Sequence, residues 1–517
     1  MSSLAMPIGS VNVAMMTAYT PNDFVAAVID EAVVADLDLP FYPRPMPKPS
    51  MADENWLDPA LKKDMLKQLR EWHVSFDTAR AARLGMRAAH ASARKYMGKR
   101  CWLPMVTIES GRMHYKPSLN PQSSKADRAL LDFADGLPIA TDAQVYQGEL
   151  TVSELWPDGL TPAQADKIVA DPLRYDDWMH GDGPLLRLRA AQWLAEFHAT
   201  GLGYVDHMVH YRDQTCSGPS HYVALLRDDE LAPHVDLVHS DEPDLYTHVA
   251  ARAVALAQSI DTETAQAVAR HGITRDIAKM VVMPRGYGAK RRSVENAIIQ
   301  HFYGSIERGL MTAPYDNMYR FCLCLAECLW LASEDVMRRP LALQRWLGEV
   351  ATQAAREQVQ LRWIAPSGFP VAIAEWRKSA RRIRTHVGQT LWCPKVYDDT
   401  DQLDGNAMRQ TVPPTFIHSF EAAFLARAVA YAQHLDDPIT DVALIHDSIG
   451  VHCTALPDLL ADDGPIKRAW VDQYTPDHLA AVADCFQEQL ADDLPPLPVY
   501  GTHQASEVSL SGRFFQT

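Results

Sequence analysis

The stretch Val442–His452 reads VALIHDSIGVH and places three polar residues between two short apolar runs. Apolar runs of this length, rich in β-branched residues, are typical of buried strands. His446, Asp447 and Ser448 lie where a tight turn joins the runs, so the stretch predicts a β-hairpin. Asp and Ser bond their own backbone in turns, which explains these residues as turn chemistry. A functional site at the turn is the second explanation.

A second carboxylate has a similar setting far earlier in the chain. Asp213, in YRDQTCSGPSHY, follows a predicted strand and precedes a helix opened by Ser217 and Pro219. Two carboxylates on neighbouring strands can hold two divalent cations about 3.5–4 Å apart, and such a pair stabilises the entering and leaving oxygens of a phosphoryl displacement. A lone Asp at a turn is usually structural, so neither carboxylate indicates a metal site without the other.

Between the two carboxylates lies a helical pattern that carries cations, ITRDIAKMVVMPRGYGAKRR. Arg275, Lys279, Met283 and Tyr287 recur every four residues and share one helix face. Two cations at this spacing repel each other unless an anion lies between them, and a nucleoside triphosphate is such an anion. Two surface cations on an ordinary helix are the competing interpretation. Pro284 predicts a kink in the axis.

Composition limits the class of protein. The chain has 517 residues, 47% hydrophobic and 22% charged, which predicts a folded globular protein of roughly two to four subdomains. Its net charge of -16 argues against a protein coated with nucleic acid, although not against a local basic cleft. Its eight cysteines lack a framework spacing and no apolar run is long enough to span a bilayer, so we expect a reducing cytoplasm and no membrane partner.

Local patterns predict an α+β fold in which helices are inserted between pieces of a small antiparallel sheet. Helical patterns cover residues 59–99, 161–200 and 244–360, short strands fall within 361–373, and a loop is expected at 390–411. A hydrolase triad built from the three consecutive turn residues is disfavoured, because adjacent strand side chains point apart and the chain has no G-x-S-x-G motif.

Six stretches, in this order, resemble motifs of the single-subunit, bacteriophage-type RNA polymerases, the family that includes the mitochondrial enzyme. They are ESGRMHYKPSLNPQSSKADRALL, DQTCSGPSHY, RDIAKMVVMPRGYG, WIAPSGFPV, PPTFIHSFEAAFL and HDSIG, and the similarity runs from about residue 91 to the C-terminus. The resemblance implies a right-hand polymerase fold with a small antiparallel palm sheet, mostly helical fingers and a reduced thumb. The implied divisions are an N-terminal segment with the thumb at 1–100, palm parts at 101–136, 204–232 and 419–517 (the last including a C-terminal foot), a helical insertion at 137–203, and fingers at 233–418 with a specificity-like loop at 387–410.

The resemblance also implies an enzyme that copies a DNA template into an RNA product from NTPs with two Mg²⁺ ions. Asp213, Asp447 and the backbone carbonyl of Gln214 would hold the metal ions. Lys279 and Arg275 would neutralise the triphosphate, with Lys279 also donating a proton to the leaving pyrophosphate. The remaining implied contacts are Tyr287 and His418 with the ribose 2′-hydroxyl, Met283 and Gly288 with the nucleotide, and Arg112, Tyr246 and His446 with the template and primer.

The chain also departs from the family pattern, and competing functions stay open. Family A DNA polymerases share the cation-bearing helix, but Ser448 and Met283 stand where they usually carry Glu and Phe, which favours RNA synthesis. A primase that makes short RNA primers and a nucleic-acid-binding subunit of a transcription complex are two further possible functions. Ile108 and Ser110 replace a usual Asp and Arg, and the family's N-terminal promoter-binding domain is expected to be absent. We therefore expect action on melted or single-stranded DNA, or with an accessory protein for promoter melting or single-stranded DNA binding.

Overall fold

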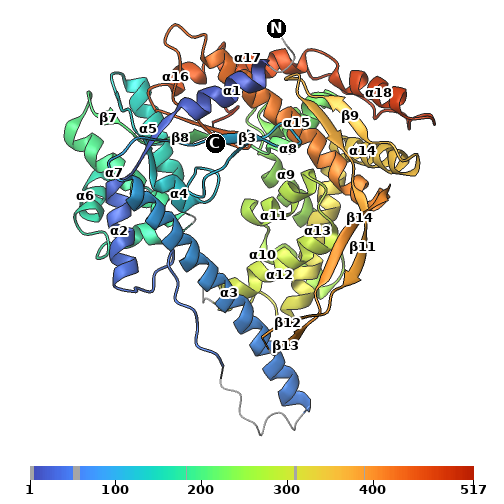
Figure 1. The fold of residues 1–517 in the computed structure, drawn as a ribbon, viewed down its shortest axis with the longest axis horizontal. Helices are drawn as coiled ribbons and strands as arrows, with labels where there is room; N and C mark the ends of the chain where they lie inside the picture. The colour runs from blue at the N-terminus through green and yellow to red at the C-terminus, as the bar shows by residue number, and fades with distance from the viewer. Residues whose placement is uncertain (1–4, 50–58, 182, 308–310, 389, 517) are drawn as a thin grey trace.

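The computed structural model describes residues 5–49, 59–181, 183–307, 311–388 and 390–516 (Figure 1). Its α-helices are α1 (Ala5–Met16), α2 (Asp23–Val34), α3 (Pro59–Tyr96), α4 (Lys125–Ala129), α5 (Asp142–Leu155), α6 (Pro162–Ala170), α7 (Pro184–Thr200), α8 (Ser217–Leu226), α9 (Leu245–Ser259), α10 (Glu263–His271), α11 (Arg275–Gly286), α12 (Arg291–Glu307), α13 (Met318–Val336), α14 (Arg338–Arg356), α15 (Gly405–Ala432), α16 (Leu456–Leu459), α17 (Pro465–Tyr474) and α18 (His478–Gln489). Its strands are β1 (Ala18–Pro21), β2 (Cys101–Trp102), β3 (Met105–Thr107), β4 (Met113–Tyr115), β5 (Leu131–Phe133), β6 (Leu137–Pro138), β7 (Val205–Asp206), β8 (His210–Arg212), β9 (Leu361–Ile364), β10 (Pro370–Ile373), β11 (Trp376–Arg382), β12 (Thr385–Val387), β13 (Thr390–Trp392), β14 (Lys395–Leu403), β15 (Ala443–Ile445) and β16 (Ser448–Val451). Among the described helices, none has the length and apolarity that crossing a bilayer requires.

A three-stranded antiparallel sheet, in the order β15-β16-β8, lies at the centre of the fold. The predicted hairpin is confirmed: Ile445 pairs with Ser448, and His446 and Asp447 form the turn between the strands. His446 has φ 51°, the left-handed conformation that tight turns need. β16 then pairs with β8 through Ile449 and Arg212, so the end of β8 lies beside the hairpin turn. The mixture of helices and small antiparallel sheets confirms the predicted fold class.

The N-terminal segment packs into the body that holds the central sheet. β1 is the middle strand of a second sheet, in the order β2-β1-β5. The Thr17 side chain and the Val442 backbone exchange hydrogen bonds of 3.0 and 3.1 Å, and Tyr19 donates to the Val442 carbonyl at 3.2 Å. Helix α3 instead runs from this body to the lower edge of Figure 1, like the expected thumb-like helix. The division expected at 1–100 therefore combines a packed segment with a projecting helix.

Helices α9–α14 form a lobe on one side of the central strands, and α2 and α4–α7 lie on the opposite side (Figure 1). α15 spans residues 405–432 and packs against α1, α8, α14 and α17. The boundary expected between residues 418 and 419 therefore falls inside one continuous helix. Asp404 caps the start of α15 by accepting from the backbone N–H groups of Asn406 and Ala407.

The prediction of a loop at residues 390–411 was wrong, because most of these residues belong to two strands and a helix. Strands β13 and β14 and the first turns of α15 occupy them. β11 pairs with β14, and β12 pairs with β13, so the projecting hairpin extends from Trp376 to Leu403 rather than over 387–410. The acidic residues of β14 suggested a loop, but Lys378 of β11 lies directly across from Asp399, and Arg381 forms an ion pair with Asp398 at 2.9 Å.

Candidate active site

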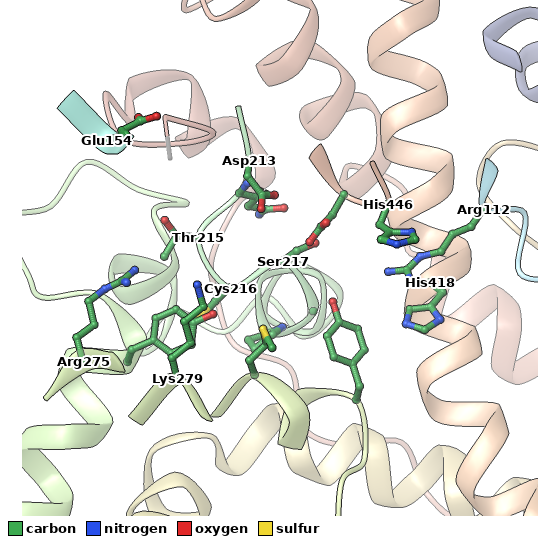
Figure 2. A pocket seen from close by; sticks show the side chains of 17 residues that line it. Arg112, Glu154, Asp213, Thr215, Cys216, Ser217, Arg275, Lys279, His418 and His446 are labelled. Atoms are coloured by element: carbon green, nitrogen blue, oxygen red, sulfur yellow. Dashed lines mark hydrogen bonds between the residues drawn. The ribbon is translucent and has the colours of Figure 1, made fainter. Parts of the chain in front are cut away.

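A cavity of about 650 Å³ opens at the end of β8 and is bounded by α8, α11, α15 and the β15–β16 turn. The predicted site residues that line it are Arg112, Asp213, Gln214, Tyr246, Arg275, Lys279, Met283, Tyr287, His418, His446 and Asp447. Residues that are far apart in the sequence thus share one space (Figure 2). Gly288 does not line the cavity, since it faces a neighbouring hollow with Gln344.

The two carboxylates meet because of strand register. Arg212 pairs with Ile449, and Ser448 donates from Oγ to the Arg212 carbonyl at 3.0 Å. Asp213 follows Arg212 and Asp447 precedes Ser448, so both carboxylates leave the same end of the sheet. Burial raises the pKa of each, and the nearby Asp447 raises the pKa of Asp213 further. A bound cation would oppose both effects and favour the ionised form of the pair.

The cations of α11 lie on the opposite wall of the cavity. Lys279 and Arg275 point toward it in Figure 2 and both lie against the ring of Tyr246, at 5.8 and 5.0 Å from its centroid. Arg275 Nε also donates to Asp244 at 2.5 Å. Cation–π contact and this ion pair offset the repulsion between cations four residues apart. The helix ends at Gly286, so Tyr287 lies just beyond it with its ring still directed into the cavity.

A group of rings and one guanidinium forms the third wall. The ring centroids of Tyr287 and His418 are 5.2 Å apart. Figure 2 shows His418, His446 and Arg112 close together on this side of the cavity. Burial, followed by the positive charge of Arg112, lowers the pKa of His418 to about 3 and that of His446 to about 4. Both imidazoles are therefore neutral at neutral pH and carry one donor and one acceptor each.

Several residues of the site were missed from the sequence. Glu421 lies behind the cavity, fully buried, and accepts from the Tyr287 hydroxyl at 2.6 Å and from Ser217 Oγ at 3.3 Å. Arg112 forms an ion pair with the same carboxylate. A single Glu in the apolar run FIHSFEAAFL was the signal that could have revealed it, because a charge inside a buried helix needs partners. The remaining lining residues were not predicted as part of the site, although Ser217 and Pro219 were expected to open a helix; they are Glu154, Thr215, Cys216, Ser217, Gly218 and Pro219.

Oxygen ligands make the cavity suitable for Mg²⁺. Two carboxylates and the nearby carbonyl of Gln214 are hard donors, and Mg²⁺ keeps waters for its remaining positions. A second group, Asp206, His210 and Cys453, is buried and close enough to hold a metal. The oxygens of Asp206 already accept from Trp193 Nε1 at 3.0 Å and from backbone N–H groups, so this group is better explained as a hydrogen-bond network.

Comparison with known proteins gives consistent matches. The family model for DNA-dependent RNA polymerase matches residues 163–511. A DNA-directed RNA polymerase of Enterobacteria phage T3 is 26% identical over 574 aligned positions, covering 96% of this chain and 63% of the relative. T7 RNA polymerase of Escherichia phage T7 is 25% identical, covering 78% and 52%, and DNA-directed RNA polymerase 1, mitochondrial, of Arabidopsis thaliana is 25% identical, covering 77% and 42%. The chain thus spans less than two thirds of the length of these relatives.

Proposed function

This chain belongs to the family of DNA-dependent RNA polymerases, and from this membership we propose that it copies a DNA template into RNA from nucleoside triphosphates. The main support is the shared cavity of about 650 Å³, which two carboxylates, two cations of α11 and a Tyr–His pair all face. A space of this size accommodates a nucleotide. Template-directed nucleotidyl transfer uses carboxylates that bind metal ions, cations that bind the triphosphate and side chains that contact the sugar.

In this proposal Asp213, Asp447 and the Gln214 carbonyl hold two Mg²⁺ ions. When bound, the ions neutralise charge on the phosphate and favour ionisation of the primer 3′-hydroxyl. Lys279 and Arg275 bind the triphosphate across the cavity from the carboxylates, and Lys279 is the proton donor to the leaving pyrophosphate. The remaining roles are sugar contact by Tyr287 and His418, nucleotide packing by Met283, and template and primer contact by Arg112, Tyr246, His446 and, at the edge of the site, Gly288.

We also propose that the DNA template must be melted or single-stranded, or opened by an accessory protein. In the segment IESGR, Arg112 is the only cation, and its guanidinium is already engaged by Glu421. Ile108 is exposed and Ser110 is buried, so neither grips a phosphate. In the projecting hairpin, Arg381 forms an ion pair with Asp398 at 2.9 Å, and Lys378 lies opposite Asp399. These acidic partners weaken the hairpin's attraction for duplex DNA.

The decisive experiment is extension of an RNA primer on a single-stranded DNA template with Mg²⁺, comparing NTPs with dNTPs. We expect extension with NTPs, and loss of extension in Asp213→Ala, Asp447→Ala and Lys279→Ala. The matched control is Asp437→Ala, which removes an exposed carboxylate just before the same hairpin and outside the cavity. Normal extension by Asp447→Ala would remove this residue from the mechanism, and no extension by the unaltered protein would overturn the proposal.

Template state is tested separately. The same protein is given a linear duplex, a duplex with a pre-melted bubble and a single strand of one sequence. We expect products from the last two, and from the duplex only when an opening protein is added. Efficient, specific initiation on the intact duplex without any added protein would contradict the template proposal. Product length on a long single strand separates transcription from priming, because a primase stops after a short RNA.

A further inference from the structure

Glu421 connects three elements of the site without lining the cavity itself. It lies on α15, one turn after His418, and its side chain is 0% exposed. Its Oε1 accepts from the Tyr287 hydroxyl at 2.6 Å and from Ser217 Oγ at 3.3 Å, while its Oε2 contacts Arg112. The three donors come from the C-terminal end of α11, the start of α8 and the segment before β4.

The direction of the bond to Tyr287 follows from the chemistry of the carboxylate. Burial raises the pKa of Glu421, whereas the guanidinium of Arg112, in direct contact with the carboxylate, opposes this shift and favours the ionised form. An ionised carboxylate has no proton to donate, so the Tyr287 hydroxyl must donate to it. Only the lone pairs of the Tyr287 oxygen are then available to a molecule in the cavity.

The ring of Tyr287 is fixed from further sides as well. A Cβ at Gly218 would lie 2.8 Å from Tyr287 Cζ, so the ring packs directly on the backbone at the start of α8. The centroid of the His418 ring lies 5.2 Å from that of Tyr287 on another side. The hydroxyl therefore keeps one position, and its bonding partner decides which way its proton points.

We propose that Glu421 is a positioning residue that makes the Tyr287 hydroxyl an acceptor toward the cavity, so that the site selects nucleotides whose sugar 2′ substituent donates a hydrogen bond. This inference rests on the proposed function, since it concerns the sugar of the incoming nucleotide. It predicts a ranking by donor capacity: 2′-hydroxyl and 2′-amino sugars are used better than 2′-fluoro and 2′-deoxy sugars, although fluorine and hydroxyl are close in size.

The variant Glu421→Gln reverses the polarity. A glutamine has one acceptor oxygen and one donor NH₂ group. Arg112 can only donate, so it takes the oxygen, and the NH₂ group then faces Tyr287. The Tyr287 hydroxyl must accept from the amide and turns its own proton into the cavity. The preference for the 2′-amino over the 2′-fluoro sugar should fall by about three- to tenfold, the worth of one hydrogen bond.

The test measures kcat/KM for single additions of CTP and its 2′-amino, 2′-fluoro and 2′-deoxy analogues to an RNA primer on single-stranded DNA. Because selectivity is a ratio on one template, changes in template grip through Arg112 cancel. Tyr287→Phe should abolish the donor preference, and adding Glu421→Gln to it should change selectivity no further. Glu421→Asp, which keeps an acceptor-only carboxylate, should preserve the wild-type ranking. The matched control is Glu334→Gln, which breaks a Glu–Arg pair with Arg285 outside the cavity.

The outcomes are distinct. Unchanged selectivity in a folded Glu421→Gln protein that still extends primers overturns the role of Glu421 and leaves the proposed function intact. If Glu421→Gln does not fold, equal 2′ selectivity in the unaltered protein and Tyr287→Phe overturns the inference instead. Failure of the unaltered protein to add CTP at all overturns both proposals.

Discussion

Ser448 donates a hydrogen bond from its Oγ to the backbone carbonyl of Arg212, at 3.0 Å, and so ties the turn that carries Asp447 to the end of the strand that carries Asp213. The bond is buried and joins residues 236 positions apart. A turn residue that looked like ordinary turn chemistry thus fixes the spacing of the two carboxylates.

Removing this bond should loosen the carboxylate pair. In Ser448→Ala the Arg212 carbonyl loses a buried donor, which costs about 1–3 kcal/mol of stability, and the Mg²⁺ concentration for half-maximal primer extension should rise several-fold. A Mg²⁺ titration of extension rate measures this. Ser259→Ala is the control, because Ser259 also donates to a backbone carbonyl but is exposed on α9. An unchanged Mg²⁺ requirement in Ser448→Ala would show that the bond does not position the carboxylates.

The carboxylate pair should lower the stability of the metal-free fold and provide binding energy for Mg²⁺. Because the folded-state pKa values of Asp213 and Asp447 are raised, their ionisation destabilises the fold as pH rises through the unfolded value near 4. In chelator at pH 7, Asp447→Asn should therefore unfold at a higher temperature than the unaltered protein. Mg²⁺ should raise the melting temperature of the unaltered protein and have little effect on the variant. A variant that melts lower in chelator would contradict this interpretation.

Two half-buried histidines that line the cavity should make the fold sensitive to acid. The pKa of His418 is lowered to about 3 and that of His446 to about 4, so between these values and about 6.5 the unfolded chain binds more protons. Stability is then present above pH 6.5 and is lost as pH falls toward 4, by up to about 3 kcal/mol for His418 alone. Urea unfolding from pH 7 to 4.5 should show a shallower loss in His418→Gln than in the unaltered protein. His73→Gln, at an exposed position on α3, should leave the slope unchanged.

The C-terminal aromatic residues should support the site through the core. Phe514 and Phe515 are each 1% exposed and pack on Phe424, and Phe514 also packs on Trp470. Phe514→Ala should cost about 3–5 kcal/mol of stability, and deletion of residues 514–517 should also lower primer extension. Denaturant unfolding and extension assays measure the two effects. The last of these residues, Thr517, lies outside the described residues. Unchanged elongation after the deletion would refute the prediction.

Gly218 should be intolerant of a side chain for a reason specific to Tyr287. The added Cβ of Gly218→Ala would lie 2.8 Å from Tyr287 Cζ, so the ring must shift. We expect a raised KM for NTPs and weaker discrimination against dNTPs. Gly9→Ala, where a Cβ meets nothing within 4 Å, is the control. Equal KM values in Gly218→Ala and the unaltered protein would mean that the ring position does not matter for nucleotide use.

Local sequence patterns specify the elements that carry the site. Two short apolar runs with a polar turn between them predicted the hairpin at Asp447, and four-residue spacing predicted that Arg275 and Lys279 share a helix face. These patterns are readable because a strand or helix places neighbouring residues by its own period. The motif order then indicated the family without any knowledge of distances.

Several partners of the site residues became known only from the folded molecule. Glu421 stands in the sequence as one charge in an apolar helix, and its partners Tyr287 and Arg112 lie 134 and 309 positions away. In the same way, Gly288 follows Tyr287 directly yet faces another hollow, and the acidic stretch expected as a loop is a strand that pairs with β11. Burial and partner choice depend on contacts between distant segments, which local periodicity does not encode.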